Sequence, residues 1–136
     1  DVRLMLSLEM IGYFSDLPSS QDYPLPFLSS LYSDRGNFVA LVGKLGDFAA
    51  TRRAKAIMLG ATDLPVYSIN TSPLVPGIDY SDHQSYWKEG MPALMVTDTA
   101  FLRNKHYHLA SDTYEKLDYA RMAKVVQAVY AVVQGY

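Results

Sequence analysis

The sequence predicts an α/β fold with a largely parallel sheet. Apolar segments of strand length alternate along the chain with segments of helical periodicity, an order typical of strands that are connected through helices. The chain has 136 residues, of which 49% are hydrophobic and 19% charged, so it can bury a sizeable core. It shows no repeats and no low-complexity tracts, and residues 1–136 are treated as part of one domain.

The first predicted strand covers residues 2–12, "VRLMLSLEMIG". This run is nearly continuous in apolar residues, as in a strand buried on both faces, and it ends at Gly12. A connection over residues 13–36 follows and carries three prolines and five aromatic residues; loops of this length are often functional. The second strand is predicted over residues 37–43, "NFVALVG".

A helix is expected to begin at Asp47, whose side chain suits the cap position, and to run to Leu59. Gly60 follows this segment and is expected at the C-terminal end of the helix. The third strand is predicted over residues 66–70, "VYSIN", and the loop "TSPLVPGIDY" comes after it.

The second half of the chain continues the alternation. A short helix is predicted to begin at Ser81 or Asp82 and to stop at Gly90, and a fourth strand covers residues 92–97. Asp118 then caps a final helix. The apolar residues of this helix keep the spacing of one helix face: Met122, Val125, Val126, Val129, Val132 and Val133.

Composition excludes several classes of protein and site. The net charge is -2 and no lysine or arginine cluster is present, so nucleic acid is not an expected partner. The absence of cysteine excludes disulfides and thiolate metal sites. The longest apolar runs are far shorter than a membrane span.

Glu9 and two histidines are candidates for chemistry. Glu9 lies near the carboxyl end of the first strand, where open α/β sheets place their sites. Such a carboxylate either binds a cation, forms a salt bridge or faces water at a sheet edge. His106 and His108 would face the same side of an extended backbone and could ligate one metal; the alternative is that one or both are solvated loop residues.

Asp82 and His83 open the short helix. An aspartate in this position is usually a helix cap, and the alternative is a carboxylate that orients a catalytic group. The chain has no G-x-S-x-G segment and no cysteine, so it offers no nucleophilic side chain in a recognised hydrolase motif.

Three segments, in this order, resemble the co-catalytic zinc aminopeptidases, which are zinc exopeptidases. They are "LSLEMIGYF", "YSDHQSYWKEGMPALMVTDT" and "HYHLASDTYEKLDYARM", and the resemblance covers nearly the whole chain. It implies a three-layer αβα domain, in which helices flank a mixed, largely parallel sheet. It also implies two zinc ions in the complete domain.

The resemblance assigns roles residue by residue. Glu9 stands at the position of a terminal ligand to one zinc ion, and His108 at that of a ligand to the other. Asp82 would lie behind the ligands, near the reacting water, with His83 in a supporting role. Asp112 would hold the loop that carries the zinc histidine.

The chain also departs from the family's pattern. Leu109 and Tyr114 stand where threonine and proline are usual, which bears on the loop conformation and not on the ligand. The family's upstream H-x-D motif, its bridging aspartate and the Glu-Glu pair that supplies the general base are absent from residues 1–136. We therefore expect the C-terminal portion of such a domain, without its upstream half, with an incomplete zinc site and without activity on its own.

For the complete protein, the resemblance implies removal of N-terminal residues from peptides by zinc-bound hydroxide. Two alternatives stay open: a glutaminyl cyclase-like enzyme, which uses one zinc ion, and a catalytically dead interaction module of the same fold. The expected partners are a peptide substrate and either a second copy of the chain or the upstream half. Relatives are often exported, so a periplasmic or extracellular location is an expectation from the resemblance.

Overall fold

The computed structural model describes residues 2–72 and 74–136, and it contains one four-stranded sheet of order β1-β4-β2-β3. The strands are β1 (Met5–Glu9), β2 (Val39–Lys44), β3 (Val66–Thr71) and β4 (Ala93–Thr97). β1 is parallel to β4, β2 is parallel to β3, and the central pair β2 and β4 is antiparallel. The sheet is therefore mixed and largely parallel, as the sequence predicts.

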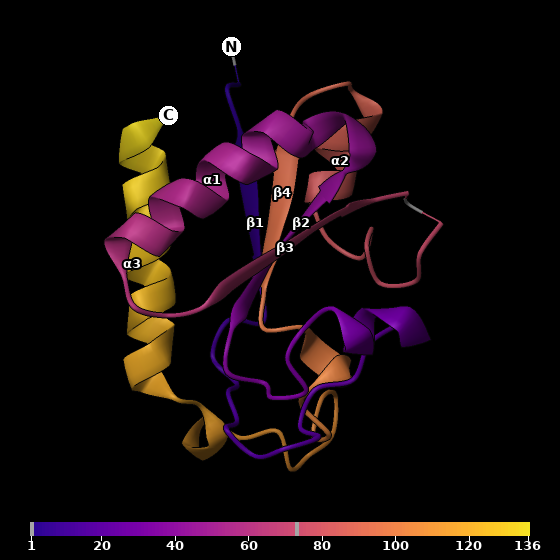
Figure 1. Ribbon diagram of the computed structural model, residues 1–136, viewed down its shortest axis with the longest axis vertical. Helices are drawn as coiled ribbons and strands as arrows, with labels where there is room; N and C mark the ends of the chain where they lie inside the picture. The colour runs from indigo at the N-terminus through magenta and orange to yellow at the C-terminus, as the bar shows by residue number, and fades with distance from the viewer. Residues whose placement is uncertain (1, 73) are drawn as a thin grey trace.

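Helices cover both faces of the sheet, which gives three layers (Figure 1). α1 (Phe48–Ala61) and α3 (Tyr119–Gly135) pack together on one face, and α2 (His83–Lys88) lies on the other. Short 3-10 turns complete the chain: η1 (Pro26–Ser30), η2 (Leu45–Asp47), η3 (Ala100–Leu102) and η4 (Tyr114–Lys116). Within the described ranges, no helix combines the length and the apolar character that a membrane crossing requires.

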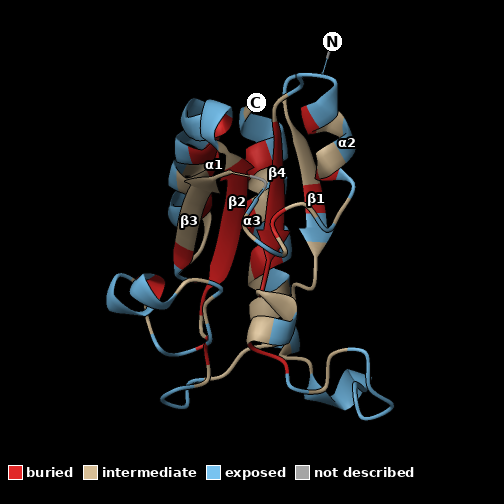
Figure 2. Ribbon diagram, turned by 90° about the vertical axis from the view of Figure 1, so that its right-hand side faces the viewer, coloured by how far each residue is buried: buried red, intermediate tan, exposed pale blue. Residues whose placement is uncertain are grey.

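The core has two parts, one on each face of the central strands β2 and β4. Figure 2 shows these two strands as the buried ones. Toward α1 and α3, buried residues of the sheet meet buried residues of both helices, among them Leu41, Val96, Met58, Val125 and Val132. Toward α2, a second cluster forms around Trp87, whose indole N–H donates to the carbonyl of Ala93 at 2.8 Å. The indole is thus buried without an unpaired donor.

The first strand differs from its prediction. It is shorter than residues 2–12, and it lies at an edge of the sheet in the described part of the chain. Leu8 is 49% exposed, so β1 is not buried on both faces. The apolar run indicates that these residues favour burial, but it does not identify the segment that buries them.

The helices differ from the prediction in three details and confirm it in one. Gly60 lies inside α1 and does not end it, because the helix continues to Ala61. Asp47 precedes α1 but makes no capping bond from its side chain. In α3 the predicted cap is confirmed, since the Asp118 carboxylate accepts from the backbone N–H of Arg121 at 2.9 Å. The buried face of α3 is narrower than predicted, because Val126 and Val133 are exposed.

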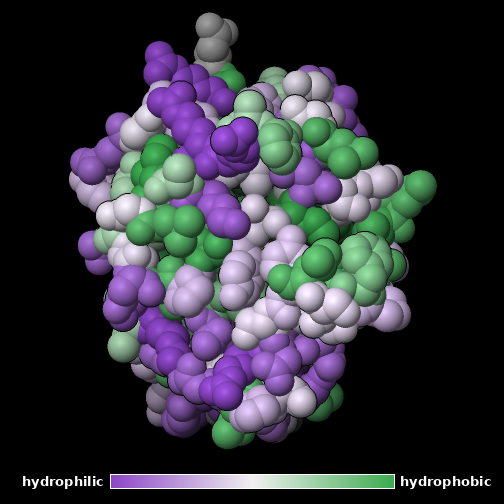
Figure 3. Space-filling view, in the orientation of Figure 1, coloured by the Kyte–Doolittle hydropathy of each residue, from purple (hydrophilic) through white to green (hydrophobic). Residues whose placement is uncertain are grey.

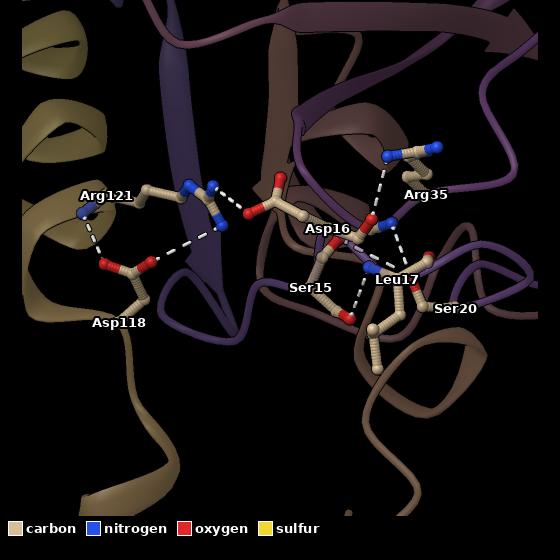
Figure 4. A network of polar contacts seen from close by, with 8 residues as sticks. Ser15, Asp16, Leu17, Ser20, Arg35, Asp118 and Arg121 are labelled. Atoms are coloured by element: carbon tan, nitrogen blue, oxygen red, sulfur yellow. Dashed lines mark hydrogen bonds and ion pairs between the residues drawn. The ribbon is translucent and has the colours of Figure 1, made fainter.

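Loops gather at the end of the sheet where β1 and β4 finish, in the lower half of Figure 1. One polar network ties the loop after β1 to the start of α3. Figure 4 shows Arg121 of α3 reaching both Asp118 and Asp16, and Arg35 donating to the backbone carbonyl of Asp16 at 3.1 Å. The long loop over residues 13–36 is therefore fastened to the body of the domain.

Candidate active site

The candidate site lies at the carboxyl ends of β1 and β4. Glu9 is the last residue of β1 and is paired in register with Thr97, the last residue of β4. Parallel neighbours that end together place their following loops at one edge, which is where open α/β sheets bind ligands. Glu9 therefore lies at the carboxyl end of its strand, as its place in the sequence predicts, and it is half-buried.

Two serine hydroxyls orient the Glu9 carboxylate. Ser81 Oγ donates to Glu9 Oε1 at 2.8 Å, and Ser7 Oγ lies 2.6 Å from Ser81 Oγ. An ionised carboxylate has no hydrogen to give, so the single hydrogen of Ser81 goes to Glu9. Ser81 must then accept from Ser7, which is buried two residues before Glu9 on the same face of β1. The hydroxyl chain fixes one carboxylate oxygen of Glu9.

A cavity of about 150 Å³ opens beside Glu9 on the α2 face of the sheet. Its floor is formed by residues of β2 and β4, and its walls come from loop 13–36, from the loop after β3 and from the loop after β4. Tyr107, which directly precedes His108, lines the same cavity as Glu9. The structure therefore brings the two predicted ligand segments to one cavity.

The histidine segment is a loop and not an extended strand, so the expectation that His106 and His108 share one side does not apply. His106 is half-buried; its backbone N–H donates to Asn104 Oδ1 and its ring Nδ1 lies 2.9 Å from Ser111 Oγ. His108 is exposed, and its ring stacks on that of Tyr107 with centroids 3.9 Å apart. The imidazole of His108 is thus accessible to a ligand, whereas the hydrogen bonds of His106 stabilise the loop.

Left-handed backbone gathers around this end of the sheet. Positive φ angles occur at Met10 (53°), Thr99 (78°), Ala100 (48°) and His108 (60°). Residues with a Cβ rarely adopt this conformation, and such strain concentrates at functional sites. Met10 follows Glu9 directly, and Thr99 and Ala100 line the cavity, so the strained positions surround the candidate site.

The other predicted site residues occupy different surroundings. His83 is fully buried, with Nε2 2.6 Å from the carbonyl of Ile78 and its ring edge-on to Trp87, which is a structural position. Asp82 is exposed and precedes α2 without a capping bond, next to Ser81. Asp112 accepts from Asn104 Nδ2 at 3.0 Å and so closes the loop that contains both histidines.

A buried polar cluster behind the cavity is not apparent from the sequence. Arg103 Nε donates to Gln21 Oε1 at 2.8 Å, and its Nη1 donates to the carbonyls of Tyr13 and Phe38. Asp98 accepts from three backbone N–H groups, those of Gly12, Tyr13 and Ala100. The sequence offers one signal for this cluster, which is that two charged residues, Asp98 and Arg103, follow an apolar strand.

The electrostatics of this cluster are set by burial. Loss of water raises the pKa of Asp98 to about 6, although its backbone N–H donors and Arg103 act in the opposite direction. Burial likewise lowers the pKa of Arg103 to about 10, so the guanidinium stays charged at neutral pH. Arg103 Nη2 is buried without a hydrogen-bond partner, and the ring of Phe38 lies 4.6 Å below the guanidinium carbon.

Glu9 and His108 are of residue types that bind zinc, but two ligands are too few for a zinc site. A carboxylate oxygen and an imidazole nitrogen are common zinc ligands, and Glu9 has one oxygen fixed by Ser81 while the ring of His108 is exposed. Among residues 2–72 and 74–136, no group of three or more His, Cys, Asp or Glu side chains could hold a metal ion. Glu9 and His108 would need further ligands to complete either metal site.

The fold and the sequence place this chain in a family of zinc exopeptidases. The chain belongs to Peptidase family M28, the co-catalytic zinc exopeptidase family, whose model matches residues 1–133. It is 55% identical over 128 residues to the Escherichia coli (strain K12) protein YfbL, and the match covers 94% of this chain. The chain spans 40% of the length of YfbL.

Solved structures share the fold. The crystal structure of the aminopeptidase LapA from Legionella pneumophila aligns with a TM-score of 0.68 and 20% identity over 96% of this chain and 31% of LapA. LapB from the same organism aligns with a TM-score of 0.70 and 17% identity over 98% of this chain and 31% of LapB. Both alignments confirm the predicted three-layer α/β fold.

Proposed function

We propose that the protein containing this chain is a zinc-dependent aminopeptidase, in which Glu9 and His108 each bind one of two zinc ions. The observation that carries the proposal is the cavity lined by both Glu9 and Tyr107, the neighbour of His108, at the carboxyl edge of the sheet. When bound, two zinc ions would supply an activated water for attack on the scissile carbonyl. The serine hydroxyls would keep Glu9 turned toward its metal.

The remaining ligands and the general base are proposed to come from parts of the whole protein outside these residues. The family is zinc-dependent, and this chain spans 40% of the length of YfbL, so there is room in such a protein for the other donors. Asp82 is proposed to face the reacting water from the start of α2, and Asp112 to hold the histidine loop. His83 supports α2 from within the core.

The test uses the full-length protein loaded with zinc. We expect hydrolysis of an amino-acid p-nitroanilide with a free amine and none of its Nα-acetyl derivative, since an aminopeptidase needs the free N-terminus. Glu9→Gln and His108→Ala should each lower both zinc content and kcat/KM, the latter at least about 100-fold. The matched control is Glu89→Gln, exposed at the end of α2. A zinc-loaded protein that instead cyclises a glutaminyl peptide, or does neither reaction, would overturn the proposal.

The 136-residue chain by itself should show no aminopeptidase activity, even with added zinc. Glu9 and His108 would belong to different metals, and neither metal would then have the three protein ligands typical of catalytic zinc. The measurement is the rate of p-nitroaniline release by the purified chain. Turnover that is proportional to the chain and is lost in Glu9→Ala would contradict this expectation.

A further inference from the structure

The loop that carries His108 has no buried residue of its own. Residues 105–116 follow η3 and Asn104, and each of them is exposed or only half-buried. Figure 3 shows mostly hydrophilic residues over the lower end of the molecule, where Figure 1 places the loops. Burial of apolar side chains therefore does not fix this loop, and its position has to come from polar contacts with the body of the domain.

Asn104 supplies such contacts from a buried position. It is 1% exposed, and both polar atoms of its side chain are bonded: Nδ2 donates to Asp112 Oδ1 at 3.0 Å, and Oδ1 accepts from the backbone N–H of His106 at 2.9 Å. Its backbone carbonyl accepts from the N–H of Tyr107 at 3.2 Å. One buried residue thus holds the loop on both sides of His108.

The backbone at His108 needs this support. Its φ of 60° lies in the left-handed region, which residues with a Cβ adopt only where their surroundings impose it. The N–H of Leu109 donates to the carbonyl of His106 at 2.8 Å, and the N–H of Asp112 donates to the carbonyl of Leu109 at 2.9 Å. These turns begin and end at the two residues that the Asn104 side chain holds, so releasing that side chain would also release His108.

Asn104 is itself fixed relative to the strand that carries Glu9. Its N–H donates to the carbonyl of Ala100 at 2.7 Å. The Asp98 carboxylate, which is buried just after β4, accepts from the N–H of Ala100 at 2.9 Å and from two N–H groups of residues 12–13, shortly after Glu9. The connection between the Glu9 segment and the histidine loop therefore consists of two buried side chains and one tight turn.

We propose that Asn104 is a positioning residue that sets the place of His108 relative to Glu9. It acts through the loop that it holds and not by contact with substrate or metal. This inference rests on the proposed function, because the spacing matters for chemistry only if Glu9 and His108 bind the two metal ions of one site. It names the residue on which the position of the second ligand depends.

The first experiment swaps the two partners of one hydrogen bond. Asn104→Asp replaces the donor with an acceptor and sets two carboxylates against each other, whereas Asn104→Asp combined with Asp112→Asn restores one amide and one carboxylate. In the full-length, zinc-free protein at neutral pH, the amides of His106, Tyr107 and Leu109 should exchange hydrogen at least about 10-fold faster in the single variant. The paired variant should recover most of the protection. Unchanged rates in Asn104→Asp, or no recovery in the pair, would overturn the inference.

The second experiment measures the consequence for the metal site. In competition with a chelator, the full-length Asn104→Asp protein should bind zinc about 10- to 100-fold more weakly than the unchanged protein, and the paired variant should regain affinity.

The matched control is Asn70→Asp, which makes the same change at another bonded asparagine. Asn70 Nδ2 donates to the carbonyl of Lys44 and to Thr51 Oγ1. Asn70 is in register with Gly43, which pairs with Leu94 near the start of β4, so it lies away from the end of the sheet where Glu9 stands. This control should leave zinc affinity unchanged even where it lowers the melting temperature. An equal loss of zinc affinity in Asn70→Asp would show that lost stability, and not the place of His108, weakens the site.

The two measurements separate this inference from the proposed function. If the unchanged protein bound zinc and Asn104→Asp bound it equally well, the inference would fail and the proposed function would stand. If the unchanged protein bound no zinc and cleaved no anilide, the proposed function would fail. Faster hydrogen exchange in Asn104→Asp, with recovery in the paired variant, would in that case still show that Asn104 positions His108.

Discussion

At the scale of single residues, a serine hydroxyl orients the Glu9 carboxylate. Ser81 donates to one of its oxygens and itself accepts from Ser7, so the other oxygen is left to face a ligand. When a side chain binds a metal, hydrogen bonds to its atoms that do not contact the metal fix its orientation and raise the metal affinity. This arrangement makes the two serines positioning residues for the proposed zinc site.

Removing the Ser81 hydroxyl should therefore weaken zinc binding. In the full-length protein, we expect Ser81→Ala to raise the zinc dissociation constant by about 10- to 100-fold, and Ser7→Ala to raise it less, because Ser7 acts only through Ser81. Ser85→Ala, at an exposed position of α2, serves as the control. The measurement is competition with a chromophoric chelator, and an affinity equal to that of the unchanged protein in Ser81→Ala would show that Glu9 does not need this bond.

Asp98 should make stability depend on pH. Its pKa in the folded protein is raised to about 6 by burial, above the ordinary 3.8, so the folded state binds the proton more tightly than the unfolded state. Its contribution is fully present below about pH 4 and is lost as the pH rises through about 6. Relative to Asp98→Asn, the unfolding free energy of the unchanged protein should fall by about 3 kcal/mol between about pH 4 and pH 7.

The comparison with Asp98→Asn isolates this carboxyl, because every other titrating group is common to both proteins. Urea unfolding of the full-length protein at several pH values gives the difference. A difference that stays constant with pH would mean that the three N–H donors and Arg103 outweigh the burial of the carboxylate.

At the scale of elements, periodicity locates strands and helices well but does not assign their neighbours. β2, β3 and β4 lie within a few residues of their predicted ranges. β2 and β4 are short buried runs, whereas β3 is only half-buried after Val66. β1 is predicted as doubly buried and is found at an edge, since the same apolar run suits either position. In α3, the small residue Ala128 belongs to the buried face, whereas Val133 at 66% exposure does not.

The candidate site was accessible to sequence analysis only in part. Glu9 was predictable because a carboxylate at the end of an apolar strand is conspicuous and because its segment resembles a known family. Ser7 and Ser81 lie in two of the segments that resemble the family, but the bond between them was not predictable, because it joins residues 74 positions apart. The same holds for Gln21 and Arg103, which are 82 positions apart.

Two glycines give a test of the helix boundaries. Gly60 lies inside α1 with open space around its Cα, so Gly60→Ala should stabilise the protein by about 0.5 kcal/mol through helix propensity. Gly90 also has open space but a φ of +74°, so Gly90→Ala should destabilise it by about 1–2 kcal/mol. Chemical unfolding should show that Gly60→Ala raises the free energy of unfolding and that Gly90→Ala lowers it. If Gly60→Ala lowered it instead, Gly60 would stand at the end of α1, as the sequence predicts.

At the scale of the whole molecule, one face is apolar and unpartnered. A groove runs between α3 and β1 with the residues just before it. Arg3 and Tyr136 line it together with seven apolar residues: Val2, Leu4, Leu6, Leu8, Val129, Val132 and Val133. We call this surface the β1–α3 groove. One side of β1 pairs with no strand in the described part of the chain, so backbone groups and apolar side chains are exposed side by side. Surfaces of this kind recruit another strand or another chain.

The isolated 136-residue chain should therefore self-associate through the β1–α3 groove. Multi-angle light scattering should give a mass that rises with concentration above the 15.2 kDa of one chain. Val133→Lys places a charge in the groove and should shift the mass toward the monomer, because a lysine there must be desolvated on association. Leu45→Lys, at a 68% exposed position in η2, should have no such effect, since it lies outside the groove. A chain that stays monomeric at all concentrations and melts cooperatively would show that this groove needs no partner, and that residues 1–136 are stable without the rest of the proposed domain.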